Sequence, residues 1–287
     1  MTDLRTTSLE QSPSVAVSDA AAIGEHAEVP LRVYRPDACA GTALLWVHGG
    51  GFAYGDLDMP EADWVARSLA ERGTFVVTVD YRLATETVRF PEPSNDVLTA
   101  WTWLVDRAQK LSGVPIGSLH LGGASAGGNL ALGAALRIRD EDPAAEKAPL
   151  PASLLLAYPT LHAVQRQPSD ELAALLESLP VESRWGPDAV REMYERFVAV
   201  PLESAPAYAV PGTMDPSGLP PTIIVASETD GLRASAEEFA EALASAGVPH
   251  RYLVEPGTWH GHINGPQAPS AHATIERFDT WLREHRR

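Results

Sequence analysis

The sequence predicts an α/β fold with a mostly parallel central sheet, helices on both faces and a helical cap. Three observations support this class. Short apolar runs typical of buried strands alternate with longer amphipathic segments along the chain. The 287 residues, 45% of them hydrophobic, suffice for one large domain with a sizeable core. One long helical interval without a predicted strand, residues 161–219, interrupts the alternation.

The first 40 residues are polar and predict an N-terminal tail that leads into a short cap segment or the first strands. Alternating apolar residues at 14–18 and 29–34 indicate one or two antiparallel strands. The beginning of the sequence lacks the basic and then apolar stretch of a secretory signal. No apolar run approaches the roughly 20 residues that span a bilayer. We therefore expect a cytoplasmic location.

Six apolar runs predict the buried strands that follow. They are short, rich in Leu or β-branched residues, and bounded by Gly, Pro or Asp. They cover residues 43–47, 74–79, 118–123, 153–158, 222–227 and 250–255. The amphipathic segments between and after them predict helices at about 60–72, 94–111, 127–140, 234–246 and 271–286. Such alternation at this scale produces a mostly parallel sheet.

The interval 161–219 predicts a helical cap inserted into the core, which comprises residues 41–160 and 220–287. It holds two helical pieces, at about 169–179 and 187–199, and prolines recur from Pro168 to Pro211. A long insertion between two strands of such a sheet is usually a lid over the active face.

Composition excludes several classes of partner and site. The chain has 22 basic and 38 acidic residues, a formal net charge of −16. A nucleic-acid partner needs a basic patch, and an anionic membrane would repel this protein, so we expect a small-molecule partner instead. The single cysteine, Cys39, excludes intramolecular disulfides and a Cys-rich zinc site. We interpret Cys39 as a small buried or loop residue rather than a nucleophile.

The strongest chemical signal is Gly-Ala-Ser-Ala-Gly at residues 123–127. A predicted strand precedes it and a predicted helix follows it. This context is typical of a nucleophile elbow, in which the serine lies on a tight strand-to-helix turn and small neighbours let the strained backbone pass. Ser125 is therefore the candidate nucleophile. The alternative is a glycine-rich loop that binds phosphate.

A second signal is His-Gly-Gly-Gly-Phe at residues 48–52, directly after a predicted strand. Consecutive glycines expose backbone N–H groups, and such a loop can aim two of them at an oxyanion, while the residue after the nucleophile supplies a third. We expect His48 to orient this loop by hydrogen bonding. The alternative is an ordinary glycine turn between strand and helix.

A serine nucleophile needs a base and an acid. The positions of the histidines and carboxylates relative to the predicted strands leave two candidates for each role. His260 and His262 lie in the glycine-rich loop after the last predicted strand. Glu228 and Asp230 follow the strand before it, where Asp230 could alternatively cap a helix. Two histidines this close could also suggest a metal site, but no nearby carboxylate or cysteine completes a ligand set, so we expect no metal.

Together these motifs resemble the hormone-sensitive-lipase-like family of α/β-hydrolases, the bacterial carboxylesterases. The similarity spans about residues 30–286. It rests on HGGGF at 48–52, DYRLATE at 80–86, GASAGGN at 123–129, GLPPTIIVASETDGLR at 218–233 and WHGH at 259–262.

The resemblance implies an α/β-hydrolase fold and a defined set of site residues. It implies a catalytic triad of Ser125, His260 and Asp230, and so favours His260 over His262 and Asp230 over Glu228. It places the oxyanion hole at the N–H groups of Gly50, Gly51 and Ala126. It implies hydrolysis of short- to medium-chain acyl esters through an acyl-enzyme, without a cofactor, by a monomer or homodimer.

Other functions fit the same scaffold. An amidase, lactonase, carbamate hydrolase or acyltransferase would use the same triad, because fold and triad do not fix the acyl acceptor. A non-hydrolytic binding protein or a cyclase would typically have lost a triad member.

This sequence also departs from the family pattern at several positions. Ala124 stands where an acidic or polar residue is usual, Thr85 replaces a proline, and His262 replaces an aromatic residue. Fewer residues than usual precede the glycine motif, which predicts a shortened N-terminal cap and an open pocket.

Apolar residues of the cap and the neighbouring loops are candidates for the substrate pocket, with ordinary core packing as the alternative for each. Trp259, beside the proposed base, is the best candidate for a pocket wall. The full set is Phe52, Tyr54, Leu161, Trp185, Tyr194, Phe197, Tyr208 and Trp259.

Overall fold

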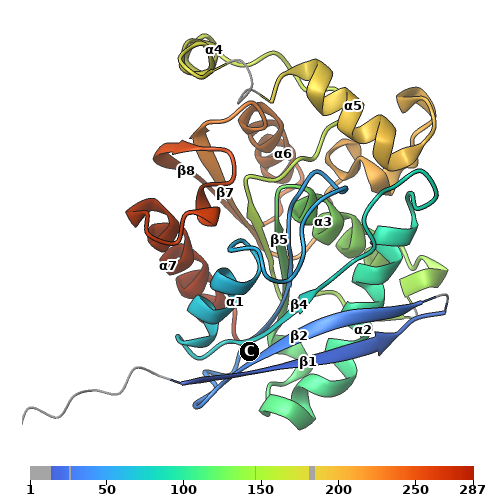
Figure 1. The fold of residues 1–287 in the computed structure, drawn as a ribbon, viewed down its shortest axis with the longest axis vertical. Helices are drawn as coiled ribbons and strands as arrows, with labels where there is room; N and C mark the ends of the chain where they lie inside the picture. The colour runs from blue at the N-terminus through green and yellow to red at the C-terminus, as the bar shows by residue number, and fades with distance from the viewer. Residues whose placement is uncertain (1–13, 26, 146, 181–184) are drawn as a thin grey trace, which may run out of the picture.

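The computed structural model describes residues 14–25, 27–145, 147–180 and 185–287, and within these ranges it contains one eight-stranded sheet (Figure 1). The strand order is β1-β2-β4-β3-β5-β6-β7-β8. The strands are β1 (Val15–Ile23), β2 (Glu28–Pro36), β3 (Ala43–Val47), β4 (Phe75–Val79), β5 (Leu119–Ala124), β6 (Leu154–Ala157), β7 (Thr222–Thr229) and β8 (His250–Trp259).

The sheet is mostly parallel, as predicted. Only the first two strands run against their neighbours, since β1 pairs antiparallel with β2 and β2 with β4. The five pairings from β4 through β3 to β8 are all parallel. The predicted tail falls partly on residues 1–13, outside the described residues, and the first two strands account for most of residues 15–36. Cys39 lies in the exposed loop between β2 and β3.

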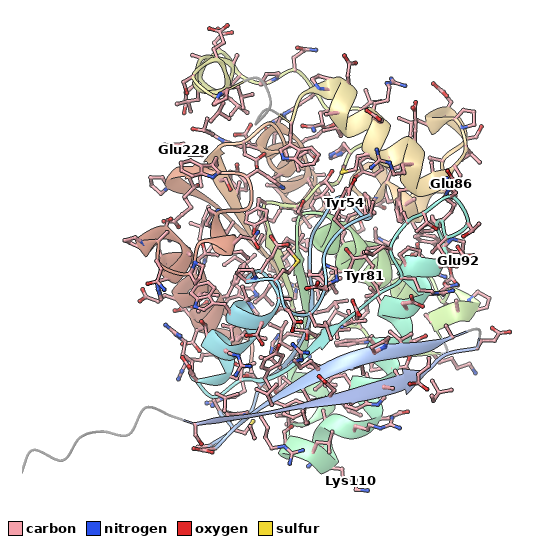
Figure 2. The ribbon with its side chains drawn as sticks, in the orientation of Figure 1. Tyr54, Tyr81, Glu86, Glu92, Lys110 and Glu228 are labelled. Atoms are coloured by element: carbon pink, nitrogen blue, oxygen red, sulfur yellow. The ribbon has the colours of Figure 1, made fainter. Side chains whose placement is uncertain are left out.

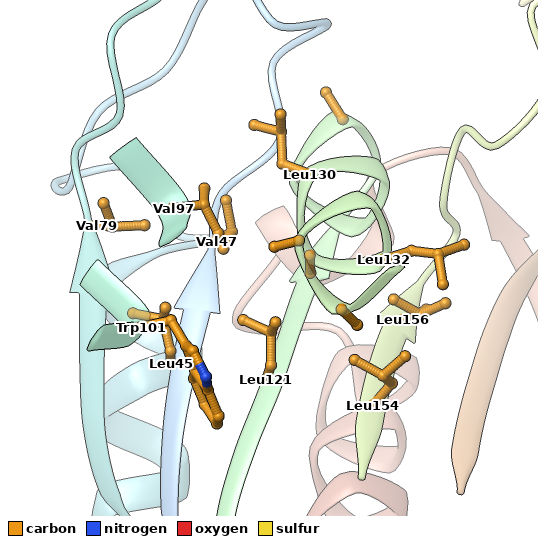
Figure 3. Packing of buried hydrophobic residues seen from close by; sticks show 14 of the residues in the cluster. Leu45, Val47, Val79, Val97, Trp101, Leu121, Leu130, Leu132, Leu154 and Leu156 are labelled. Carbon is orange, nitrogen blue, oxygen red and sulfur yellow. The ribbon is translucent and has the colours of Figure 1, made fainter. Parts of the chain in front are cut away.

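Helices cover both faces of the sheet. The helices are α1 (Asp63–Ala70), α2 (Glu92–Ser112), α3 (Ala126–Arg139), α6 (Arg233–Ser245) and α7 (Pro269–Glu284). Successive residues of a strand point to opposite faces, so Leu45 packs toward α2, α3 and α6 while Trp46 packs toward α1 and α7. Figure 3 shows α3 over the central strands, with Leu121 and Leu156 among the side chains between them.

The described residues between β6 and β7 form α4 (Asp170–Glu177), α5 (Pro187–Val198) and three short 3₁₀ helices, at Leu202–Ser204, Ala207–Ala209 and Pro211–Thr213. These described residues contain no strand, in agreement with the sequence. In Figure 1, α4 and α5 lie at the top of the view, at the end of the sheet where the central strands terminate.

Two strands run further than predicted, and this extension bears on the site. β7 and β8 continue to Thr229 and Trp259, which face each other after a register shift between Ser227 and Thr229. β8 is an edge strand, where Pro256 is tolerated because it need not donate a ladder hydrogen bond. Asp230 directly follows β7 and His260 directly follows β8, so the extension places both residues at the same corner of the sheet.

None of the helices in the described ranges combines the length and apolar character needed to cross a bilayer.

Candidate active site

Ser125 lies between the end of β5 and the first residue of α3. Its φ of 52° and ψ of −118° are strained for a residue with a side chain. The turn passes so close to β3 that a side chain at Gly127 would overlap the Val47 carbonyl oxygen. A backbone hydrogen bond of 2.9 Å from Ser125 N–H to the carbonyl of Ala157 fixes the turn from the other side. The close approach of these backbone segments therefore explains why the motif consists of small residues.

The structure brings Ser125, His260 and Asp230 together. The Oγ of Ser125 lies 3.0 Å from Nε2 of His260, and Nδ1 of His260 lies 2.8 Å from Oδ2 of Asp230. Asp230 is almost completely buried, and its Oδ1 also accepts a hydrogen bond from the N–H of Leu232. Burial lowers the pKa of His260, but the charge and hydrogen bond of Asp230, with a contribution from Glu61, raise it above its ordinary value overall.

His262 and Glu228, the alternative candidates for the base and the acid, make contacts outside the triad. Both ring nitrogens of His262 are engaged, Nδ1 with Ser227 Oγ at 2.9 Å and Nε2 with Thr274 Oγ1 at 2.8 Å. Burial lowers the pKa of His262 to about 4, so the ring is neutral at pH 7. Glu228 accepts a hydrogen bond from the N–H of Gly257 at 2.8 Å.

The glycine loop presents unused backbone donors beside Ser125. The carbonyl of Gly50 accepts hydrogen bonds from the N–H groups of Ala53 and Tyr54, and Gly50 has a φ of 104° that favours glycine. Within the described residues, the N–H groups of Gly50, Gly51 and Ala126 have no protein acceptor. They can therefore donate to an oxygen bound next to Ser125.

His48 supports this loop from behind. Its Nδ1 lies 2.8 Å from the carbonyl oxygen of Gly49, and its ring stacks on Tyr81 with centroids 4.4 Å apart. The Tyr81 hydroxyl donates to the carbonyls of His48 and Gly49. Burial lowers the pKa of His48, which favours the neutral form of its ring beneath the loop.

Sequence reasoning missed Glu61, a buried carboxylate at the centre of the site. Its side chain accepts hydrogen bonds from the N–H of Gly49, the hydroxyl of Tyr158 and the amide of Asn264. The sequence around it, Met-Pro-Glu-Ala-Asp, carries no signal that separates Glu61 from the solvent-exposed acids typical of a helix start.

Ser125 and His260 open into a cavity of about 580 Å³. Three of the predicted pocket residues, Tyr54, Trp185 and Trp259, line it. The Trp185 ring lies 5.5 Å from the His260 ring, whereas Tyr54 and Trp259 are about two-thirds exposed at the mouth. In Figure 2, Tyr54 lies below α5 on the loop that leaves β3.

For Phe52 and Phe197 the predicted pocket position is wrong. Both are completely buried, and their rings stack on each other with centroids 3.9 Å apart. They join the glycine loop to α5, whose aromatic residues Tyr194 and Phe197 pack into the core instead of facing the cavity. Leu161 and Tyr194 are also fully buried and do not line the cavity, and the Tyr208 hydroxyl contacts Asp140 elsewhere on the surface.

The comparisons with known proteins agree with the geometry of the site, because they point to ester hydrolases of the alpha/beta hydrolase fold. Residues 44–264 match the model of a family described as having the alpha/beta hydrolase fold. An ethyl acetate hydrolase from Pseudomonas putida is 34% identical over 242 residues, which cover 81% of this chain and 70% of that protein. The carboxylesterase NlhH from Mycobacterium tuberculosis is 34% identical over 241 residues, which cover 83% and 72% of the two chains.

Solved structures are similar over nearly the whole chain. EstE1, a thermophilic carboxylesterase cloned from a metagenomic library, superposes with a TM-score of 0.81 at 26% identity, covering 96% of this chain and 91% of that one. A bacterial heroin esterase superposes with a TM-score of 0.79 at 32% identity, covering 95% and 85%.

Proposed function

The chain belongs to the alpha/beta hydrolase fold family, and from this premise we propose that it is a serine carboxylesterase acting on short- to medium-chain acyl esters. The observation that carries the proposal is the continuous hydrogen-bonded line from Ser125 through His260 to Asp230 at the wall of the cavity. A nucleophile in contact with a base, and that base in contact with an acid, is the arrangement that activates a hydroxyl group.

In the proposed reaction, Ser125 Oγ attacks the ester carbonyl while His260 Nε2 accepts its proton. Asp230 holds the imidazole by Nδ1 and stabilises the imidazolium. The oxyanion accepts hydrogen bonds from the N–H groups of Gly50, Gly51 and Ala126, and one such donor lowers the barrier by about 3 kcal/mol. His260 then protonates the leaving alcohol, and water repeats the sequence on the acyl-enzyme.

We further propose that residues 161–219 act as the cap of this site. Among the described residues of this segment, five on or next to α5 line the cavity that contains Ser125: Trp185, Ala189, Glu192, Met193 and Arg196. A cap built in this way selects substrates through its side chains. The cytoplasmic location and the monomeric or homodimeric state stay predictions.

The direct test is hydrolysis of p-nitrophenyl esters of increasing acyl length. We expect turnover to be highest for short acyl chains and to fall by at least about 10⁴-fold in Ser125→Ala. Ser153→Ala is the matched control, because that buried hydroxyl contacts His120 and Trp281 away from the cavity. A folded wild-type protein that hydrolyses none of these esters contradicts the proposal.

A further inference from the structure

Glu61 lies just before α1, and its side chain is buried in the wall of the cavity that contains Ser125. The residue is only 2% exposed. Burying a carboxylate costs several kcal/mol unless hydrogen bonds compensate for the lost water. The hydrogen bonds that Glu61 accepts at the centre of the site therefore point to a role that an apolar side chain could not fill.

One oxygen of Glu61 holds the glycine loop. Oε1 accepts a hydrogen bond of 2.6 Å from the N–H of Gly49. The carbonyl of Gly49 is held from the opposite side by the Tyr81 hydroxyl at 3.0 Å. Because Gly49 is fixed at both its N–H and its carbonyl, the next two N–H groups along the chain, the proposed oxyanion donors, have a defined starting point and direction.

The other oxygen of Glu61 reaches the elements around the proposed base. Oε2 accepts from the Tyr158 hydroxyl at 2.6 Å and from the Asn264 amide at 3.1 Å. The Asn264 amide also donates to the carbonyl of Gly261, the residue after His260. The Tyr158 and His260 rings pack in a T-shaped arrangement, with centroids 5.0 Å apart.

The backbone of Glu61 completes the connection. Its N–H donates to the Asn264 side-chain oxygen at 3.1 Å, and its carbonyl accepts from the Trp46 indole at 2.8 Å. Three segments that are distant in the sequence thus meet at one residue: the glycine loop after β3, the end of β6 and the loop after β8.

We propose that Glu61 is a positioning residue that locks the oxyanion loop and the His260 loop into a single geometry for ester hydrolysis. The inference rests on the carboxylesterase function proposed above. Glu61 transfers no proton and does not contact the reacting carbonyl; it acts through Gly49 on one side and through Tyr158 and Asn264 on the other.

The charge of Glu61 gives this role a signature that simple packing would lack. The titratable groups next to His260 are Asp230 after β7, Glu61 before α1, Tyr158 after β6 and His262 after β8. From α5, Glu192 and Arg196 line the same cavity. Burial and the charge of Glu61 raise the pKa of Tyr158 well above its usual value, so it remains a neutral donor. His262 is neutral at pH 7. Glu61 is therefore the second negative charge that favours the imidazolium of His260, after Asp230.

Two substitutions of Glu61 separate the effect of side-chain length from the effect of charge. Activity is measured with p-nitrophenyl acetate as the substrate. Glu61→Gln keeps the length but removes the charge and sets an amide donor against those of Tyr158 and Asn264. Glu61→Asp keeps the charge but is too short to reach Gly49 and Tyr158 together. We expect kcat to fall about tenfold to a hundredfold in both, with KM within about threefold of wild type. The apparent pKa of kcat/KM should decrease only in Glu61→Gln.

Two further variants keep the test decisive. Glu255→Gln is the matched control, because Glu255 is a buried glutamate paired with Arg277 outside the cavity. We expect it to lower thermal stability without changing kcat or the pH profile. Tyr158→Phe removes one donor to Glu61 with little change in volume, and tests the same contact if the Glu61 variants do not fold. It should lower kcat without lowering the apparent pKa.

The outcomes discriminate clearly. Folded Glu61→Gln and Tyr158→Phe with wild-type kcat and pH profile overturn the positioning role, while wild-type ester hydrolysis leaves the proposed function intact. Equal losses in Glu61→Gln and Glu255→Gln, with unchanged pKa, also overturn it in favour of a purely structural role. Absence of turnover in the wild type overturns both proposals.

Discussion

The polar contacts of the site differ in how visible they are in the sequence. Ser125 and the glycine loop stand in short motifs whose strand-to-turn context is readable along the chain, and for that reason they were predicted. Glu61 and Asn264 are 203 residues apart and carry no motif, so only the fold reveals that they meet. Local patterns therefore predict the reacting groups, whereas the groups that hold them in place depend on tertiary packing.

At this scale the pH dependence of activity is a direct prediction. The raised pKa of His260 means that the imidazolium persists above the ordinary histidine value of about 6.5. Since only the neutral imidazole can accept the Ser125 proton, kcat/KM should increase with pH and reach half its plateau above about 6.5. A pH–rate profile from 5 to 9 measures this. A flat profile is incompatible with His260 as the base, whereas a midpoint below 6 contradicts the raised pKa of His260.

At the scale of elements, periodicity predicted strands and helices well but misjudged two features. The Pro256-Gly257 pair suggested a loop, yet β8 continues through it because an edge strand tolerates proline. The aromatic residues of α5 suggested a pocket wall, yet Val190, Met193, Tyr194 and Phe197 are buried. Their i, i+3, i+4, i+7 spacing is the signature of a helix face in a core, and this signal was present in the sequence.

The packing of α5 on the glycine loop leads to a stability prediction. Phe197→Ala removes a fully buried ring that stacks on Phe52, and should lower the free energy of unfolding by about 3–5 kcal/mol. Urea denaturation measures this loss. Trp259→Ala, at an exposed residue of the cavity mouth, should change stability by only about 0.5 kcal/mol and instead alter KM for bulky esters. If Phe197→Ala instead altered KM for bulky esters with little loss of stability, Phe197 would be a pocket residue after all.

At the scale of the whole molecule, the parallel sheet explains why three distant residues meet. Ser125, Asp230 and His260 follow the carboxyl ends of β5, β7 and β8, and the carboxyl ends of parallel strands lie at one edge of the sheet. The alternation of strands and helices predicted this sheet. The strand order and the extension of β7 and β8 required the structure, because they depend on pairing between segments far apart in the chain.

The central claim, that Ser125 is the activated nucleophile of a serine esterase, is tested most directly by covalent trapping. Incubation with diethyl p-nitrophenyl phosphate should release one equivalent of p-nitrophenol, as Ser125 Oγ displaces it and retains the diethylphosphoryl group. Intact-mass measurement should show one adduct per chain, and peptide mapping should place it on Ser125, with no adduct in Ser125→Ala. An unmodified wild-type protein, or an adduct on another residue, would contradict the account.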